Sequence, residues 1–396
     1  MINITRLKDR LMKLSEISEP GEGITRISFT PIYRKGMSYI QSVMQEVGLE
    51  TRVDSISNLI GRWEGKQTEN KIIAIGSHID TVPNGGKYDG AIGVLSAIEV
   101  VQSLEEDGYC PIHPIEVLSF INEEGSAHAE IGGVFGSRAM MGLVSVDQRM
   151  ERELSKINLT KDDIVNAYRD PEQFNCYLEI HIEQGRELEK ENIPIGVVTG
   201  IVGTWRFHVT VKGVASHAGT TPMNQRNDAL LKSLPVIQYV NEIAKGINEG
   251  MVGTVGDVVV IPGASNVVPG EVILKLEFRS IHEEYLEKAV KMLQEKINLM
   301  NGSSLQGISK SDPVMLNRRL QNIIHTVCQE SGIESILIPS FAGHDARETA
   351  KKIPTALIFI PSKGGISHSP LEYTSDHFIE KGASVLLETV KQLDRT

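Results

Sequence analysis

Residues 71–76 (KIIAIG) and 115–121 (IEVLSFI) are two short apolar runs bounded by glycine, proline or asparagine. Runs of this length and composition are typical of strands that are buried on both faces of a sheet. Between them, apolar residues recur at helical spacing over residues 90–104. A strand, a helix and a second strand in this order predict a right-handed crossover. The sequence therefore predicts an α/β fold with a mostly parallel sheet and helices on both faces.

A different pattern begins near residue 200. Residues 206–212 and 272–278 alternate apolar and polar side chains, which indicates antiparallel strands with one face packed on helices. Residues 227–247 and 281–300 carry apolar residues at helical spacing and would supply those helices. These elements predict a two-layer α+β domain inserted at residues 205–317.

The first pattern returns after this insertion. Residues 356–360 (ALIFI) read as another buried strand, and residues 383–393 as a closing helix. A chain of 396 residues also exceeds the size that one hydrophobic core usually serves. Residues 1–204 and 318–396 are therefore expected to fold together as one domain, separate from the insertion.

Charge and hydropathy exclude several classes of function. The chain has 40 basic and 51 acidic residues and a net charge of -11, which disfavours binding to nucleic acid. Its N-terminal segment lacks the apolar core of a signal peptide, and no apolar run reaches the length of a membrane span. Three cysteines without metal-type spacing favour reduced thiols. We therefore expect a cytoplasmic protein that binds neither nucleic acid nor membranes.

Histidine and aspartate residues follow the first predicted strand. His78 and Asp80 come directly after it, and Asp89 lies in the glycine-rich segment before the predicted helix. Because functional groups gather at the carboxyl ends of parallel strands, His78 and Asp89 are candidate metal ligands. Asp80 would be placed to orient the His78 ring. The alternative is a solvated glycine-rich loop that binds nothing.

Two adjacent carboxylates, Glu123 and Glu124, follow the second predicted strand. Adjacent carboxylates at a strand end repel each other unless a cation or a proton lies between them. A metal ion bound to one of them relieves the repulsion and leaves the other as a general base. The alternative is an acidic pair at the surface, but the apolar run directly before it favours a site.

Two further histidines complete a set of ligand types. His181 lies in the strand-like segment YLEIHIEQG, and His368 lies in GGISHSP. Each alone is weak evidence, because a half-buried histidine in a strand is ordinary. Together the candidates supply imidazole and carboxylate ligands of the kind that two Zn- or Mn-like ions require, namely His78, Asp89, Glu124, His181 and His368.

Seven motifs resemble those of the dimetal peptidase and aminoacylase superfamily, specifically its hydantoinase/carbamoylase branch. They are SHIDT, YDGAIG, NEEGS, EIHIEQG, SHAGTTPM, SNVVPG and GGISHSP, and the resemblance runs from about residue 24 to the C-terminus. The branch includes N-carbamoyl-L-amino acid hydrolases, allantoate amidohydrolases and β-ureidopropionases. Its members usually have a second glycine before AGHDA where this chain has Phe341, which leaves the side-chain preference open.

The resemblance implies how the candidate ligands are shared. Asp89 would bridge two divalent ions in each subunit, with His78 and His181 completing one site and Glu124 and His368 the other. The ions would be Zn, Mn, Co or Ni, which all accept imidazole and carboxylate ligands. Peptidase relatives commonly have a carboxylate at the position of His181, so a histidine there marks the carbamoylase branch.

The resemblance also implies which residues act on the substrate. Glu123 would be the general base, with Asp80 and His217 as further catalytic residues. The Asp89–Gly90 peptide would be cis, a conformation that is costly outside proline.

Four residues would bind the substrate itself. Gln184 and His217 would contact its carbamoyl group, while Asn266 and Arg279 would hold its carboxylate, the arginine as a bidentate pair. On the residues alone, Arg279 could equally be an exposed strand position and Asn266 a turn residue.

These assignments predict a metal-dependent hydrolase of linear amide and ureido C–N bonds, with a small ureido or carbamoyl carboxylate as its substrate. The first expectation is that it cleaves the carbamoyl C–N bond of N-carbamoyl-L-amino acids, releasing the amino acid, CO2 and ammonia. An allantoate amidohydrolase or a β-ureidopropionase is the alternative. A non-catalytic metal- or solute-binding protein is the alternative from another class, and the carboxylate pair argues against it. Residues 1–204 and 318–396 would be the dimetal catalytic domain, and the insertion a lid through which a homodimer forms.

Overall fold

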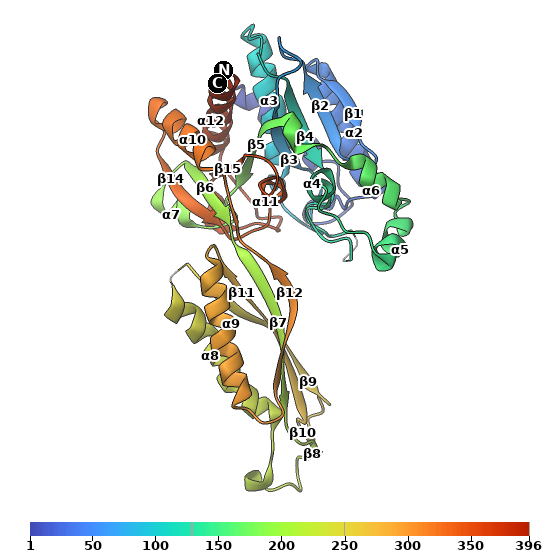
Figure 1. Ribbon diagram of the computed structural model, residues 1–396, viewed down its shortest axis with the longest axis vertical. Coiled ribbons are helices and arrows are strands. Elements are labelled where there is room, and N and C mark those ends of the chain that lie inside the picture. The colour runs from blue at the N-terminus through green and yellow to red at the C-terminus, as the bar shows by residue number, and fades with distance from the viewer. Residues whose placement is uncertain (128–129, 249, 396) are drawn as a thin grey trace. The chain divides into compact units, whose positions relative to one another are not determined.

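The computed structural model describes residues 1–127, 130–248 and 250–395 and contains two compact units (Figure 1). The first unit consists of Met1–Thr199 and Leu316–Thr396, and the second is the continuous segment Gly200–Met315. The sequence placed the inserted domain at residues 205–317, so the second unit begins and ends a few residues earlier. None of the described helices combines the length and the hydropathy needed to cross a bilayer.

The first unit is built on a mixed sheet. Its strands are β1 (Glu50–Val53), β2 (Leu59–Trp63), β3 (Ile72–His78), β4 (Ile115–Phe120), β5 (Phe174–Ile182), β6 (Ile195–Ile201), β14 (Ser335–Ser340) and β15 (Thr355–Ile360). Four neighbouring strands at its centre, in the order β4-β3-β5-β15, are parallel. Antiparallel pairing adds β2 and β1 on one side and β6 on the other, and β14 pairs with β6. The predicted parallel sheet is confirmed for the centre, whereas its antiparallel flanks were not predicted.

Helices cover both faces of this sheet. They are α1 (Ile4–Ser15), α2 (Pro31–Glu46), α3 (Ala91–Glu106), α4 (Phe135–Met140), α5 (Gln148–Lys156), α6 (Lys161–Ala167), α7 (Glu187–Glu191), α10 (Arg318–Glu330), α11 (Asp345–Thr349) and α12 (Asp376–Asp394), with 3-10 turns η1 (Pro171–Gln173) and η3 (Lys363–Gly365). α3 and α12 pack together on one face, and α4 and α11 pack together on the other (Figure 1). β3 and β4 are buried along their whole length, which explains why their sequences are almost entirely apolar.

The second unit is a two-layer α+β structure. Its elements are β7 (Gly203–Lys212), β8 (Ser216–His217), η2 (Met223–Gln225), α8 (Ala229–Ile247), β9 (Val252–Ile261), β10 (Val267–Val268), β11 (Glu271–Ser280), α9 (Glu283–Asn298), β12 (Ser304–Ser311) and β13 (Val314–Met315). The main sheet has the order β12-β7-β11-β9 and is antiparallel throughout. α8 and α9 pack on one face of it, where alternate residues of β7 are buried. β8 and β10 form a separate pair, and β13 pairs with the end of β6.

The peptide bond between Asp89 and Gly90 is trans, so the expectation of a cis bond there is wrong. The cis peptide in the described residues is Ile261–Pro262. Gly90 instead adopts a positive φ of 62°, a conformation that glycine takes without steric cost. This turn leads directly into α3 and directs the Gly90 N–H to His181 Nε2, 3.1 Å away.

Candidate metal centre

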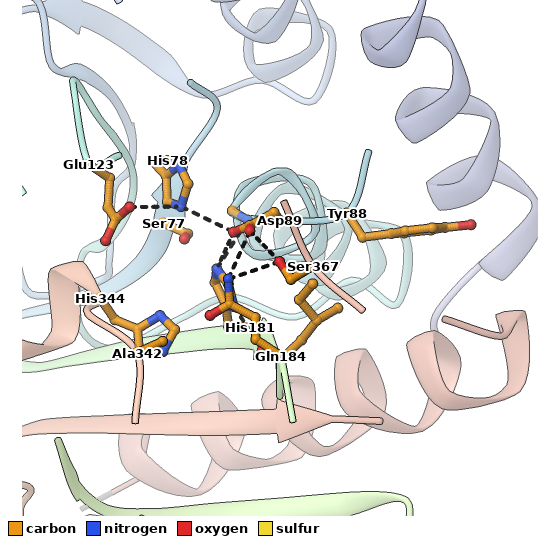
Figure 2. A network of polar contacts seen from close by, with 12 residues as sticks. Ser77, His78, Tyr88, Asp89, Glu123, His181, Gln184, Ala342, His344 and Ser367 are labelled. Carbon is orange, nitrogen blue, oxygen red and sulfur yellow. Dashed lines mark hydrogen bonds and ion pairs between the residues drawn. The ribbon is translucent and has the colours of Figure 1, made fainter. Parts of the chain in front are cut away.

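Neighbouring parallel strands bring most of the candidate ligands together (Figure 2). β3 ends at His78, Glu123 and Glu124 follow β4, and His181 lies near the end of β5. Because these strands are adjacent and parallel, their carboxyl ends meet at one edge of the sheet. The turn before α3 adds Asp89, so that the side chains form a cluster at this edge in which His78, Asp89 and His181 are buried.

The first group of ligand atoms consists of His78, Asp89 and His181. Asp89 Oδ1 lies 3.7 Å from His78 Nε2 and 3.1 Å from His181 Nε2. In each ring Nδ1 faces a backbone carbonyl, that of Asp80 at 3.1 Å and that of Ile182 at 2.9 Å. When a metal ion is bound and each ring is neutral, the carbonyl would keep the proton on Nδ1 and leave the lone pair of Nε2 for the ion.

The second group consists of Asp89, Glu124 and His368. His368 lies in the loop before α12, and its side chain is half exposed. Its Nε2 is 3.3 Å from Asp89 Oδ2 and 3.3 Å from Glu124 Oε2. Asp89 therefore presents one carboxylate oxygen to each group.

The geometry of both groups fits a divalent metal ion. Ligand atoms about 2.1 Å from a tetrahedral ion lie about 3.4 Å from one another. The separations around Asp89 are 3.1, 3.3 and 3.7 Å, and all ligand atoms of a group lie within 4.8 Å of one another. Imidazole nitrogen and carboxylate oxygen are ligands that Zn, Mn, Co and Ni accept.

Protonated imidazoles and carboxylates stabilise each other in this cluster. Burial alone would raise the pKa of Asp89, but hydrogen bonds from His181 and His368 outweigh burial and hold the pKa well below its usual range. Asp89 and Glu124 in turn raise the pKa of His368 to about 10. A divalent ion would take the place of these protons, because metal binding requires neutral imidazole and ionised carboxylate.

Glu123 lies beside the two groups with only 10% of its side chain exposed, but it belongs to neither of those found in the described residues. Its Oε2 lies 3.6 Å from His78 Nε2 (Figure 2). Burial raises its pKa well above that of an ordinary glutamate, and the like charge of Glu124 adds to this effect while His78 opposes it. A carboxylate with a raised pKa can accept and return a proton near neutral pH.

Asp80 holds both glutamates and His78 in place through hydrogen bonds and a close contact. Its Oδ1 accepts a hydrogen bond from Glu123 N and its Oδ2 one from Glu124 N, both at 3.1 Å. Its Oδ1 also lies 3.5 Å from His78 Nδ1. One carboxylate therefore fixes the backbone of both glutamates together with the His78 ring.

Gln184 contacts the shared ligand directly. Its backbone has a positive φ of 59°, and its Nε2 donates to Asp89 Oδ2 at 2.8 Å and to Ser367 Oγ at 3.0 Å. Its Oε1 is buried and has no hydrogen-bond partner within the described residues. A buried acceptor without a partner is costly, so this oxygen is available to an N–H group of a ligand.

Sequence reasoning missed three residues of the site. The His344 ring packs edge-on against that of His181 with 4.5 Å between centroids, and burial and His181 hold the pKa of His344 well below its usual value. Ser367 and Glu372 lie against the turn that carries Asp89, and burial followed by the charge of Asp89 raises the pKa of Glu372 to about 7. The only sequence signal for Ser367 was its position next to a candidate ligand.

Two of the predicted substrate-binding residues, His217 and Asn266, lie together in the second unit. His217 pairs with Val267 across β8 and β10, and the Asn266 carbonyl accepts a hydrogen bond from Ala218 N at 2.9 Å. His217 Nδ1 accepts from Gly219 N at 3.0 Å and from Thr220 N at 3.2 Å. Because these N–H groups occupy Nδ1, the proton of the neutral ring is on Nε2, which makes the exposed imidazole a hydrogen-bond donor.

Arg279 also belongs to the second unit. It lies on β11, and its Nε donates to Glu277 Oε1 at 2.7 Å. Arg206, on the neighbouring strand β7, donates to Glu277 Oε2 at 3.0 Å. Two arginines on neighbouring strands thus share one glutamate.

Comparisons with known proteins identify the family of this chain. Residues 74–392 match the family model described as Peptidase family M20/M25/M40. The chain is 37% identical to the N-carbamoyl-L-amino acid amidohydrolase of Geobacillus stearothermophilus over 99% of both chains. It is 35% identical to the allantoate amidohydrolase of Bacillus subtilis (strain 168), over 94% of this chain and 93% of that one.

A solved structure of an amidase has a similar fold. The crystal structure of an amidase of the hydantoinase/carbamoylase family from Burkholderia multivorans matches with a TM-score of 0.89 and 30% sequence identity. The match covers 100% of this chain and 98% of that one. The chain therefore belongs to peptidase family M20/M25/M40, in its hydantoinase/carbamoylase branch, and is a hydrolase that acts on linear amide C–N bonds.

Proposed function

We propose that this chain is a two-metal amidohydrolase that cleaves the carbamoyl C–N bond of N-carbamoyl-L-amino acids and releases the amino acid, carbon dioxide and ammonia. The observation that carries the proposal is the Asp89 carboxylate, whose two oxygens face two separate groups of ligand atoms. Glu123 lies beside them as an additional buried carboxylate. A protein that only binds metal has no use for that carboxylate, whereas hydrolysis needs a base.

Two divalent ions would be held in each subunit. His78, Asp89 and His181 would bind one, and Asp89, Glu124 and His368 the other. Once bound, the ions would supply positive charge that makes a water molecule nucleophilic at neutral pH and polarises the carbamoyl oxygen. The donor set is compatible with Zn, Mn, Co or Ni.

The chain's own residues would move the proton. Glu123 takes it from the attacking water and returns it to the departing nitrogen. Asp80 keeps the Glu123 backbone fixed through its hydrogen bond to that N–H. Gln184 Oε1, buried and without a partner in the described residues, would accept a hydrogen bond from the carbamoyl NH2 group.

The second unit would bind the rest of the substrate. His217 Nε2–H is a donor suited to the developing oxyanion, since the backbone N–H groups at Nδ1 fix this tautomer. Arg279 would pair with the substrate carboxylate and Asn266 would donate an amide N–H to it. Phe341, partly exposed in the loop that leads to His344, would then border the substrate side chain.

A substrate panel tests the proposal. Metal-free protein is reconstituted with Zn, Mn, Co or Ni, and ammonia release is measured from N-carbamoyl-L-amino acids, their D-enantiomers, allantoate and β-ureidopropionate. We expect the highest kcat/KM with an N-carbamoyl-L-amino acid. Allantoate is the second candidate, because a relative named for that substrate matches nearly as well. No ammonia from any compound with any metal would contradict an amidohydrolase of this type.

We further propose a homodimer formed through the second unit. β9 lies at the edge of its sheet and exposes four β-branched apolar residues, Val252, Val258, Val259 and Ile261. An edge strand of this kind pairs readily with another chain, and twofold dimers are the commonest soluble assemblies. In such a dimer, each second unit would supply His217 to the metal centre of its partner.

Mixed subunits should reveal this sharing. His217→Ala and Glu123→Gln should each be nearly inactive alone, but mixing them under conditions of subunit exchange should restore up to about a quarter of wild-type activity. Half of the dimers would be mixed, and each of these would hold one complete site of two. The measurement is ammonia release after exchange verified by differently tagged subunits.

A matched control uses Glu123→Gln mixed with Glu124→Gln. Both changes damage the same unit, so no mixed dimer could contain a complete site. Recovery in this control, or no recovery in the first mixture despite verified exchange, would mean that His217 is not shared between subunits.

A further inference from the structure

Glu372 is a buried carboxylate that belongs to neither group of ligand atoms but contacts the residues around them. It lies between His368 and α12, and only 3% of it is exposed. We infer that Glu372 is a positioning residue that holds the Asp89 turn and the His368 loop together, and thereby forms the second metal group. The inference rests on the proposed two-metal function and assigns Glu372 no part in the chemistry itself.

The first observation is how Glu372 holds the backbone of the Asp89 turn. Its Oε1 accepts hydrogen bonds from Tyr88 N at 2.8 Å and from Asp89 N at 3.1 Å. Glu372 and Asp89 are 283 positions apart in the sequence, so these bonds join two distant parts of the chain. Both N–H groups are buried, so removing the carboxylate would leave two donors without a partner. Because unsatisfied buried donors are costly, the turn would shift to find new partners.

The second observation is a hydroxyl that links Glu372 to the Asp89 side chain. Ser367 Oγ lies 2.8 Å from Asp89 Oδ2 and 3.1 Å from Glu372 Oε2. Ser367 directly precedes the ligand His368, and Glu372 N donates to the Ser369 carbonyl at 3.0 Å to close the following turn. Glu372 is therefore bonded on both sides, to the turn that carries the shared ligand and to the loop that carries the ligand specific to the second group.

The third observation is the space that the chain leaves for this carboxylate. A side-chain carbon on Gly86 would overlap the carboxylate group of Glu372. Gly86 has no positive φ that would require glycine for the backbone alone. Glycine at position 86 therefore leaves the space that the Glu372 carboxylate occupies. The contact can be tested by changing either residue.

Loss of Glu372 should act mainly on the second group. Two of the three ligands of the first group, His78 and His181, are held by their own strands and backbone carbonyls, whereas the half-exposed His368 lies in a loop. Residues that support a ligand in this way typically change metal affinity by about tenfold to a hundredfold. We expect this loss at the second ion, with the first ion still bound.

The experiment titrates metal-free protein with Zn2+ by isothermal calorimetry. Wild type should bind two ions, and Glu372→Ala should bind the second about tenfold to a hundredfold more weakly. Glu372→Gln should restore the second site, because its amide oxygen can accept both backbone N–H groups and its NH2 can donate to Ser367 Oγ. Equal binding of both ions by wild type and Glu372→Ala would overturn the inference and leave the proposed function intact, whereas fewer than two ions in wild type would overturn both.

Gly86→Ala provides a second arm in which Glu372 itself is unchanged. It should weaken the second ion as Glu372→Ala does, and the double variant should be no worse than Glu372→Ala, since the overlap is then removed. Additive losses in the double variant would mean that Gly86 does not act through Glu372. Gly246→Ala, where an added carbon meets nothing within 4 Å, controls for the loss of glycine itself.

Asp394 offers a matched control for the loss of a buried carboxylate. It also accepts hydrogen bonds from two backbone N–H groups, Ile112 and His113, and from one hydroxyl, Tyr109. These partners precede β4, at the opposite end of that strand from Glu123 and Glu124. Asp394→Ala should lower the melting temperature but leave both Zn2+ affinities unchanged. A weakened second ion in this variant would show that general destabilisation explains the effect.

Discussion

Glu123→Gln should keep both metal ions and lose at least about a hundredfold in kcat, because proton transfer to a positioned base contributes at least that much. The carboxamide has the same shape as the carboxylate, and its backbone N–H remains bonded to Asp80. It cannot accept the proton of the attacking water. The measurement combines elemental analysis of dialysed protein with initial rates of ammonia release.

Glu124→Gln is the matched control for this change. The two residues are adjacent and their backbone N–H groups are held by the same aspartate, but only Glu124 faces His368, at 3.3 Å. Glu124→Gln should therefore lower the metal content of the dialysed protein, which Glu123→Gln should leave unchanged. Wild-type rates in Glu123→Gln, or metal loss equal to that of Glu124→Gln, would contradict the assignment of the base.

Arg279→Ala should reduce kcat/KM for carboxylate substrates by about 2–5 kcal/mol of transition-state stabilisation, the usual cost of leaving one partner of a desolvated charge pair alone. Amide or ester analogues of the same substrates lack that charge, so they should lose far less. The measurement compares kcat/KM for each acid and its neutral analogue in wild type and variant.

Arg206→Ala separates recognition of the carboxylate from general effects on the sheet. Arg206 and Arg279 lie on the same face and bond the two oxygens of one glutamate, Glu277. Arg206→Ala should leave the preference for acids unchanged. Equal losses for acid and neutral analogues in Arg279→Ala would show that the arginine has only a structural role.

The buried centre of the first unit could be predicted from the sequence because burial on both faces leaves an apolar run. β3, β4 and β15 all carry that pattern. The flank strand β1 does not, since most of its residues are exposed and its pairing with β2 is local. α12 begins at Asp376, earlier than the predicted residue 383, because the Ser375 side chain caps its first turn by accepting from Phe378 N.

The candidate ligands were predictable because their motifs carry distinctive residue types at strand ends. The residues that support them were not. Glu372 acquires its role only when the chain folds back on the Asp89 turn, and no local pattern marks a glutamate for such a contact. The cis peptide was predicted from resemblance and is absent at Asp89–Gly90, where the positive φ of Gly90 makes the turn.

The order of the strands along the chain also determines an order of events during synthesis. β15, which lies between β5 and β6 in the sheet, comes from residues that follow the whole second unit. The second unit is one continuous segment, so on the ribosome it can complete its own sheet first. The first unit, which carries the candidate ligands, also needs β15 and the loop with His368, and both follow the second unit in the chain. A nascent chain therefore has all three residues of the first group before His368 is added, so the second group of ligand atoms is the later of the two to form.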